Sequence, residues 1–179
     1  LVYIGNMSLS YDLETLIRCV SGMDDVTLDI AGNGPDRQRL MDLAEQLKTR
    51  RSNIMFHDYL NEAELASLLL TCDAGVIPMF PDSCVGVPGK MADYAAAGLK
   101  VVECLGGETA GLVDRFGVGT HYQAGDVTSL RNAIASVKKI NNENARAEFA
   151  RNFDATEVMD GYVEWVSGVM RCKKGWGNT

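Results

Sequence analysis

Short apolar segments alternate with apolar stripes at helical spacing along almost the whole chain. Residues 26–30 alternate apolar and polar side chains, as a half-buried strand does, and residues 40–47 carry apolar side chains three or four positions apart, as a helix does. Strands that alternate with helices of this length form βαβ units around a parallel sheet. The sequence therefore predicts an α/β fold, a Rossmann-like doubly wound parallel sheet of about six strands with helices on both faces.

The same pattern predicts where the elements lie. We expect strands at 2–5, 26–30, 53–57, 74–78, 100–105 and 117–122, and a final C-terminal helix over about 154–171. Proline suits the first position of a helix and glycine the position after its end, so Pro35 and Pro88 are expected to begin helices and Gly98 to end one. Asn61 with Glu64 resembles a capping box.

Length and charge exclude several classes of protein. The 179 residues fit one domain, and no apolar run approaches the roughly 18–20 residues of a membrane span. The net charge is −7 and the largest basic cluster is the short stretch 171–174, so we expect no nucleic-acid partner. That stretch is interpreted as a solvated tail, with peripheral contact to a membrane surface as the alternative.

Cysteine usage indicates a reducing compartment. The five cysteines are widely spaced and form no C-x-x-C pair, which argues against a disulfide framework or a zinc site. We therefore expect a cytoplasmic protein, with the inner face of the membrane as the alternative place. The chain starts abruptly with an apolar strand, which suggests a piece of a longer protein.

Three loops follow strands at the edge of the sheet where ligands bind in doubly wound folds. They are 5–8, 32–35 and the stretch before Pro88. Glycine lets backbone amides approach a phosphate, and a helix N-terminus favours an anion. Any tight turn from a strand to a helix also needs glycine, so a purely structural role stays open for each loop.

Two charged residues follow Pro88. Lys90 is expected in the first turn of a helix and Asp93 one turn later, where its carboxylate can accept hydrogen bonds from ribose hydroxyls. Spacing alone favours a simpler interpretation, in which Asp93 complements the helix dipole and Lys90 is exposed to solvent.

The segment 87–102 resembles the P-x-K-x-x-E-Y-x-A-x-G-x-P-V-V pattern of glycosyltransferase family 4 and related bacterial enzymes. Four further segments, 3–6, 28–35, 54–60 and 72–78, are similar to motifs of the same family in the same order. The resemblance covers roughly residues 1–140. It implies the C-terminal, donor-binding half of a GT-B fold, with an N-terminal acceptor domain absent from this chain.

The resemblance implies a role for each matched position. Asp93 stands in place of the ribose-binding glutamate, and Lys90 can offset phosphate charge. Further nucleotide-sugar-binding positions lie in the glycine turns, at the base, and at the diphosphate or sugar: Gly5, Asn6, Gly32 and Gly34; Asp58, Tyr59 and Leu60; Gly86, Val87, Pro88 and Gly89.

The implied activity is that of a nucleotide-sugar-dependent hexosyltransferase in polysaccharide biosynthesis. A nucleotide-diphosphate sugar is the donor, and a glycan or lipid-linked acceptor binds through the missing domain. The resemblance also implies retention at the anomeric carbon, no cofactor, no essential metal, and no transfer by this domain alone. The catalytic residues are unknown at this stage.

Two departures from the family pattern keep other functions open. Val85 stands where the family often has a first glutamate, and residues 6–14 contain no Arg or Lys where a basic pair commonly neutralises the diphosphate. A degenerate, non-catalytic binding or interaction module is one alternative, and a sugar-nucleotide epimerase of the same architecture is another. A dehydrogenase is disfavoured because Gly5 does not begin a G-x-G-x-x-G motif.

The remaining reactive side chains give no further site. His57 follows a strand at the ligand edge, but a structural role is the better interpretation for it. No cluster of carboxylates and histidines has the spacing of a metal site, and no cysteine has a nearby base in the sequence.

Overall fold

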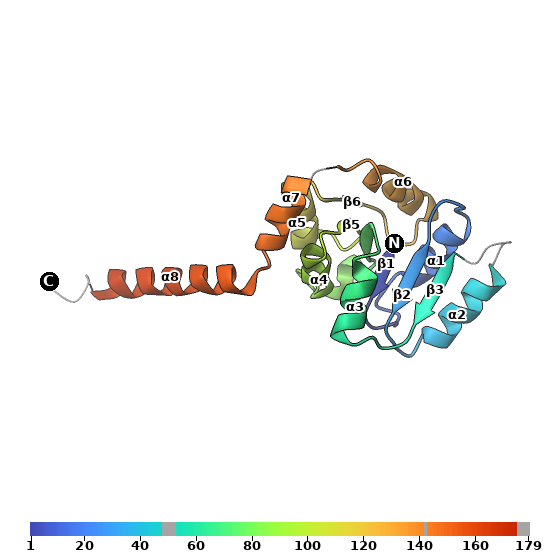
Figure 1. The fold of residues 1–179 in the computed structure, drawn as a ribbon, viewed down its shortest axis with the longest axis horizontal. Helices are drawn as coiled ribbons and strands as arrows, with labels where there is room; N and C mark the ends of the chain where they lie inside the picture. Colours follow the sequence, from blue (N-terminus) through green and yellow to red (C-terminus); the bar gives the residue numbers. More distant parts are fainter. Residues whose placement is uncertain (48–52, 142, 175–179) are drawn as a thin grey trace.

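The computed structural model describes residues 1–47, 53–141 and 143–174. Its strands form one all-parallel sheet in the order β3-β2-β1-β4-β5-β6. The strands are β1 (Val2–Ile4), β2 (Leu28–Ala31), β3 (Ile54–His57), β4 (Ala74–Ile77), β5 (Lys100–Glu103) and β6 (Gly119–His121). Figure 1 shows the sheet at the centre of the domain. The predicted fold class is confirmed.

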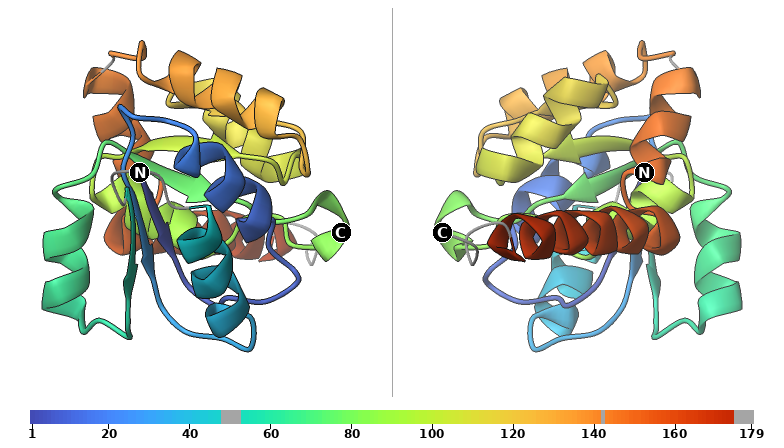
Figure 2. Two further views of the ribbon diagram at one scale, coloured as in Figure 1. Left: turned by 90° about the vertical axis from the view of Figure 1, so that its right-hand side faces the viewer. Right: turned by 90° about the vertical axis from the view of Figure 1, so that its left-hand side faces the viewer.

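Helices cover both faces of the sheet (Figure 2). In the described part of the chain they are α1 (Leu13–Ser21), α2 (Arg37–Gln46), α3 (Glu62–Leu69), α4 (Lys90–Ala96), α5 (Gly107–Phe116), α6 (Val127–Val137), α7 (Glu143–Arg151) and α8 (Ala155–Lys174), with a short 3-10 turn, η1 (Pro81–Ser83). Side chains of α1, α2 and α6 pack in one core cluster and those of α3, α4, α5 and α7 in another. This is the two-sided arrangement that a parallel sheet requires.

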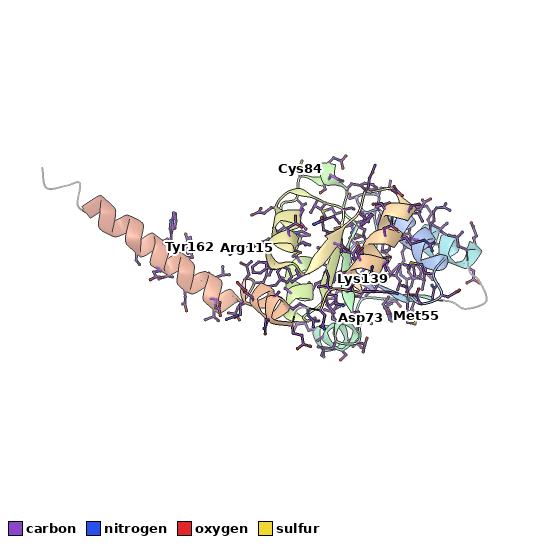
Figure 3. The ribbon with its side chains drawn as sticks, turned by 90° about the horizontal axis from the view of Figure 1, so that it is seen from above. Met55, Asp73, Cys84, Arg115, Lys139 and Tyr162 are labelled. Atoms are coloured by element: carbon purple, nitrogen blue, oxygen red, sulfur yellow. The ribbon has the colours of Figure 1, made fainter. Side chains whose placement is uncertain are left out.

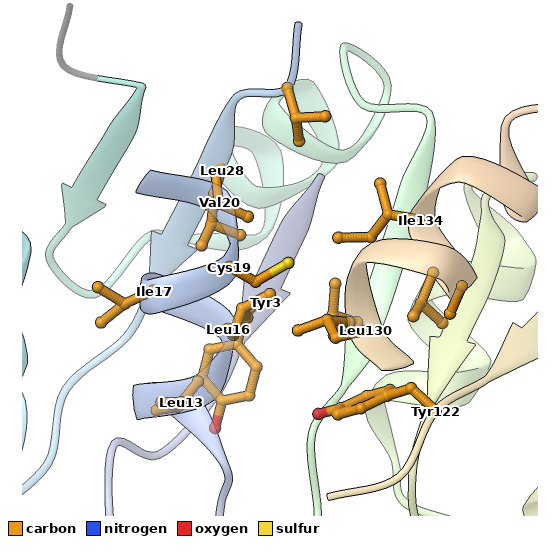
Figure 4. Packing of buried hydrophobic residues seen from close by; sticks show 14 of the residues in the cluster. Tyr3, Leu13, Leu16, Ile17, Cys19, Val20, Leu28, Tyr122, Leu130 and Ile134 are labelled. Carbon is orange, nitrogen blue, oxygen red and sulfur yellow. The ribbon is translucent and has the colours of Figure 1, made fainter. Parts of the chain in front are cut away.

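The two clusters follow from the alternation of side chains along each strand. Tyr3 points to the face covered by α1 and α6, whereas its neighbours Val2 and Ile4 point to the face covered by α4. Figure 4 shows the first cluster, in which Leu16 of α1 and Leu130 of α6 meet above the sheet. The inner strands β1, β2 and β4 are thus buried on both sides, whereas the outer strands β3 and β6 are partly exposed.

The caps of the helices agree with the sequence in part. Asn61 and Glu64 form the predicted capping box, and Gly98 follows the end of α4 with φ of 66°. The prediction that Pro35 and Pro88 begin helices was wrong by two residues, since α2 begins at Arg37 and α4 at Lys90. Both prolines lie in the preceding turn; the carbonyl of Pro88 accepts a hydrogen bond from the amide of Met91 at 2.9 Å.

The sheet parts between β1 and β4. These strands pair in register only at Val2 and Gly75, whereas β4 and β5 pair along four positions. The fully buried Tyr94 of α4 fills the gap: its hydroxyl donates to the carbonyl of Val76 at 3.1 Å and accepts from the amide of Ile4 at 3.3 Å. Its ring covers Gly75, where an added Cβ would lie 2.3 Å from a ring carbon. Tyr94 therefore fixes α4 at the point where the strands separate.

Helix α8 extends away from the rest of the domain (Figure 1). It leaves several large apolar side chains exposed, among them Tyr162, which Figure 3 shows on the extended helix. The family resemblance implies that this C-terminal helix packs back toward the N-terminal domain, and that packing stays a prediction. The side chains of the basic stretch 171–174 lie outside the described ones. Within the described residues, no helix has the length and apolar character to cross a membrane.

The contact between Gly75 and Tyr94 gives a stability prediction. Gly75→Ala forces a methyl group into the Tyr94 ring, and we expect the free energy of unfolding to fall by about 1–3 kcal/mol, the usual cost of overpacking. Gly111→Ala is the matched control, because Gly111 lies within α5 with open space around it and should gain about 0.5–1 kcal/mol. Urea denaturation of both variants measures this, and equal stability of the two would contradict it.

Candidate functional site

A hollow of about 490 Å³ opens at the carboxyl ends of β1 and β2, beside the start of α4. It lies where the strand order reverses from β1 to β4, which is where open α/β sheets bind ligands. The lining residues are Ile4, Gly5, Asn6, Ala31, Gly32, Asn33, Tyr59, Leu60, Leu65, Gly89, Lys90 and Asp93.

The hollow gathers most of the positions that the sequence motifs single out. From four segments far apart in the chain it brings together Gly5, Asn6, Gly32, Tyr59, Leu60, Gly89, Lys90 and Asp93. Sequence reasoning missed Ile4, Ala31, Asn33 and Leu65. Ile4 and Ala31 are the last residues of their strands, so the predicted strand ends could have placed them at the ligand edge. Leu65 was assigned to the core because it belongs to the apolar stripe of a helix.

Five predicted positions do not line the hollow. Asp58 points instead to the guanidinium of Arg37 at 2.8 Å and is 89% exposed. Gly86 offers its carbonyl to the hydroxyl of Thr109 at 2.7 Å, Pro88 is buried, and Val87 packs against the core cluster below α4.

Gly34 is the fifth predicted position that does not line the hollow. It lies where the loop after β2 packs against the loop after β1. An added Cβ there would lie 2.3 Å from the carbonyl oxygen of Met7, and one on Gly32 would lie 2.1 Å from that of Gly5. The amide of Met7 also donates to the carbonyl of Asn33 at 2.8 Å. The two glycine turns therefore touch backbone to backbone. Gly5 and Gly32 adopt φ values of 127° and 131°, which disfavour any other residue.

Lys90 is the one basic residue among the described residues that line the hollow. Only 8% of it is exposed, and its Nζ has no hydrogen-bond partner in the described structure. The Nζ lies 4.1 Å from the ring centre of Tyr3 and 4.3 Å from that of Tyr11. The simpler sequence interpretation, a solvated lysine, was wrong. The sequence could not show this because the two rings come from β1 and from the loop before α1.

Burial decides the charge of Lys90. An aromatic face attracts an ammonium by about 0.5–2 kcal/mol, but removing an ammonium from water costs several kcal/mol. Desolvation accordingly lowers the pKa of Lys90 from 10.5 to about 7. The empty site thus holds an amine that is poised between its neutral and charged forms near neutral pH.

Asp93 lies one helical turn further, at the exposed mouth of the hollow. Partial burial raises the pKa of its carboxyl group. A carboxylate at this place is open to hydroxyl donors of a ligand, and it can accept two hydrogen bonds on its two oxygens.

A second hollow, of about 770 Å³, adjoins the first and shares Asn6 with it. It lies between the loop 6–11 and the loop 79–85, and Val85 lines it. The residue that departs from the family's first glutamate therefore faces a cavity next to the first hollow. Neither loop contributes a lysine or an arginine to its lining.

The histidines are satisfied structural residues. His57 Nε2 pairs with Asp29 at 2.7 Å, and the ring of His121 bonds to the buried Glu103 and, at 2.8 Å, to Asp114. Burial opposes the charged form of His121, yet these two hydrogen bonds prevail and raise its pKa.

Other reactive groups give no site within the described residues. No group of His, Cys, Asp or Glu is placed there to hold a metal ion. Burial raises the pKa of the Cys19 and Cys72 thiols, and that of Cys104 to about 12, so these thiols are poor nucleophiles.

A family model with the description "Glycosyl transferases group 1" matches residues 1–139. The chain belongs to this family. The match confirms the resemblance to group 1 glycosyltransferases with a GT-B fold that the motifs at 3–6, 28–35 and 87–102 indicated. No curated protein matches the chain.

Solved structures share the fold of this group 1 domain at low identity. The catalytic domain of cholesterol-alpha-glucosyltransferase from Helicobacter pylori is 21% identical with a TM-score of 0.66, over 85% of this chain and 95% of that one. HepE (Alr3699) from Anabaena, in complex with UDP, is 18% identical with a TM-score of 0.74, over 93% of this chain. A glycosyltransferase from Rickettsia africae is 15% identical with a TM-score of 0.74, over 99% of this chain. The match covers 48% of each of the last two chains, so the domain spans about half their length.

The buried amine gives a prediction with a defined pH dependence. Lys90→Met removes the cost of desolvating the amine, and we expect the free energy of unfolding to rise by about 1–4 kcal/mol at pH 7. Since the pKa of Lys90 is lowered from 10.5 to about 7, the unfolded chain binds the extra proton between these values, and wild-type stability rises with pH across that window. The advantage of the variant should therefore shrink from pH 7 to pH 10.

Chemical denaturation of both proteins at pH 6.5 and pH 9.5 measures this difference. Lys100→Met is the control. Lys100 begins β5, at the end of the sheet away from the hollow, so its replacement should change stability with no such dependence on pH. A Lys90→Met variant that is less stable than the wild type at pH 7 would contradict the prediction.

Proposed function

We propose that this domain binds the nucleotide-diphosphate sugar donor of a hexosyltransferase in the hollow between the glycine turns and α4. The observation that carries the proposal is the convergence of motif residues from four separate segments on one cavity at the switch point of the sheet. The similar structures of HepE hold UDP and UDP-glucose, which supports a donor of this chemistry.

The base fits the end of the hollow that Tyr59, Leu60 and Leu65 form with Ala31. These side chains offer apolar surface to a planar ring, and Tyr59 is 86% exposed, so its ring is free to turn toward a base. The ribose then lies toward Asp93, whose carboxylate accepts hydrogen bonds from its hydroxyls.

The diphosphate fits between the Gly5 turn and Lys90. An added Cβ on Gly5 would lie 3.3 Å from the Lys90 Nζ, so the amine lies directly beside the turn where a phosphate would approach the backbone. In the family a basic pair commonly follows this turn, and here residues 6–14 have none. Lys90 supplies a cation from the other side of the hollow, and a charge-assisted contact is stronger than a neutral one.

The sugar then extends past Asn6 toward the second hollow, and the acceptor approaches from an N-terminal domain. Catalysis consists mainly of placing the anomeric carbon and stabilising the leaving diphosphate. The family resemblance supports retention at that carbon and a polysaccharide or lipid-linked acceptor. This domain alone holds the donor but does not transfer the sugar.

A non-catalytic sugar-nucleotide-binding domain is the alternative. The observation that favours it is Val85, which places an apolar side chain in the second hollow where a glutamate is common in the family. Transfer by the full-length protein, assayed with the donor that binds, separates the two functions.

The ribose contact gives the first test. Asp93→Asn keeps the size of the side chain but removes its charge, and we expect the affinity for the sugar nucleotide to fall about 10- to 100-fold. Titration calorimetry of the chain with UDP-, ADP- and GDP-glucose measures this and identifies the base. Asp42→Asn on the outer side of α2 is the matched control. Unchanged binding in the Asp93 variant would refute the ribose contact, and no binding of any donor would refute the donor site.

A further inference from the structure

Among the described residues, the amine of Lys90 lacks the hydrogen-bond acceptors that normally stabilise a buried cation. No hydrogen-bond acceptor reaches its Nζ within the described structure, and only 8% of the residue is exposed. Yet it lines the hollow, so a ligand there would be the first group able to accept its hydrogen bonds. An unpartnered amine that faces a cavity indicates an anionic ligand.

Two aromatic rings hold this amine in place. The Nζ lies 4.1 Å from the ring centre of Tyr3 and 4.3 Å from that of Tyr11, and the two rings contact each other edge to face with centroids 5.7 Å apart, so that they form a corner around the amine. Tyr3 is itself fixed, because it is fully buried and its hydroxyl donates to the carbonyl of Asn6. The rings keep water from the amine without offering it an acceptor.

We propose that the aromatic clamp formed by Tyr3, Tyr11 and Lys90 makes donor binding proton-linked: above neutral pH the amine is largely uncharged in the ligand-free site and takes a proton from the buffer as the diphosphate enters. The ammonium then donates hydrogen bonds to the phosphate oxygens. Lys90 is the binding residue, and Tyr3 and Tyr11 are positioning residues. The inference rests on the proposed function, since the diphosphate is what draws the proton.

The groups around the amine are consistent with this behaviour. From β1 and the following loop they are the phenols of Tyr3 and Tyr11, and from α4 itself they are Asp93 and Tyr94. Burial raises the pKa of the Tyr3 and Tyr94 phenols, so both stay neutral. Desolvation alone lowers the pKa of Lys90 to about 7, and no neighbouring carboxylate counters it. A diphosphate would be the first strong negative charge at the amine.

The sign of the linkage follows from these values. Above pH 7 the free site has lost the proton, whereas the occupied site keeps it because the phosphate charge raises the pKa of the amine again. Binding therefore takes up ~1 proton at pH 8.5, and the affinity falls with rising pH by about tenfold per pH unit in that range.

The test is calorimetry of the chain with UDP-glucose at pH 8.5 in two buffers of different ionisation enthalpy, with ADP- and GDP-glucose as the other donors. The phosphates of these sugar nucleotides do not titrate near this pH, and adenine has no ring proton that does. The N–H groups of uracil and guanine are mostly protonated at pH 8.5, so an uptake close to one proton belongs to the protein. We expect uptake close to one proton per donor. A second, direct measurement is the pH titration of the Lys90 Cε signal by carbon NMR, with and without the donor.

Three variants separate the clamp from general electrostatics. Lys90→Met should abolish the uptake and weaken binding about 10- to 100-fold. Tyr11→Leu should let water reach the amine, so that it is already charged in the empty site and the uptake falls while binding persists. Lys100→Met, remote from the hollow, should leave both unchanged.

The outcomes distinguish this inference from the proposed function. Donor binding without proton uptake, or a Lys90 titration near pH 10 in the empty protein, overturns the clamp and leaves the donor site standing. Failure of every sugar nucleotide to bind overturns both.

Discussion

The separation of β1 from β4 is the constraint on which the site depends. Parallel strands that part leave backbone groups without partners, and a buried unpaired amide or carbonyl costs about 1–3 kcal/mol. The hydroxyl of Tyr94 bonds to a group of each strand, to the amide of Ile4 and the carbonyl of Val76. Because Tyr94 belongs to α4, the same bonds set the position of that helix. Lys90, one turn earlier on α4, and Asp93, next to the tyrosine, reach the hollow for that reason.

Stability and binding are opposed at Lys90. The fold would be easier to maintain with an apolar side chain packed against Tyr3 and Tyr11, since those rings and the surrounding core offer the amine no hydrogen-bond acceptor. The proposed function accounts for its presence, since the donor diphosphate brings the negative charge that the amine lacks. The missing basic pair after the Gly5 turn and the buried lysine on α4 are then two aspects of one arrangement, in which the cation comes from the helix instead of the loop.

The sequence predicts the fold well because each of its signals is local. Alternation marks the strands, and the capping box at Asn61 and the glycine after α4 mark helix ends. The site is predicted less completely. The motifs identify the strand-end loops that form the hollow, but they do not tell which residues of each loop face it. Asp58 turns to Arg37 and Gly34 packs against Met7, and both outcomes depend on neighbours distant in sequence.

The contact between the two glycine turns divides the hollow into a fixed wall and an adaptable one. On the side of Gly5 and Gly32 the backbones touch, so that no larger residue fits and the shape of this wall is invariant. On the side of Tyr59 and Leu65 the lining residues have no such backbone contact in common, and Tyr59 is 86% exposed. In the proposed function, an engineered change of nucleobase preference therefore belongs in the loop after β3 and the first turns of α3, since the backbone contact at Gly5 and Gly32 leaves no room for a new side chain.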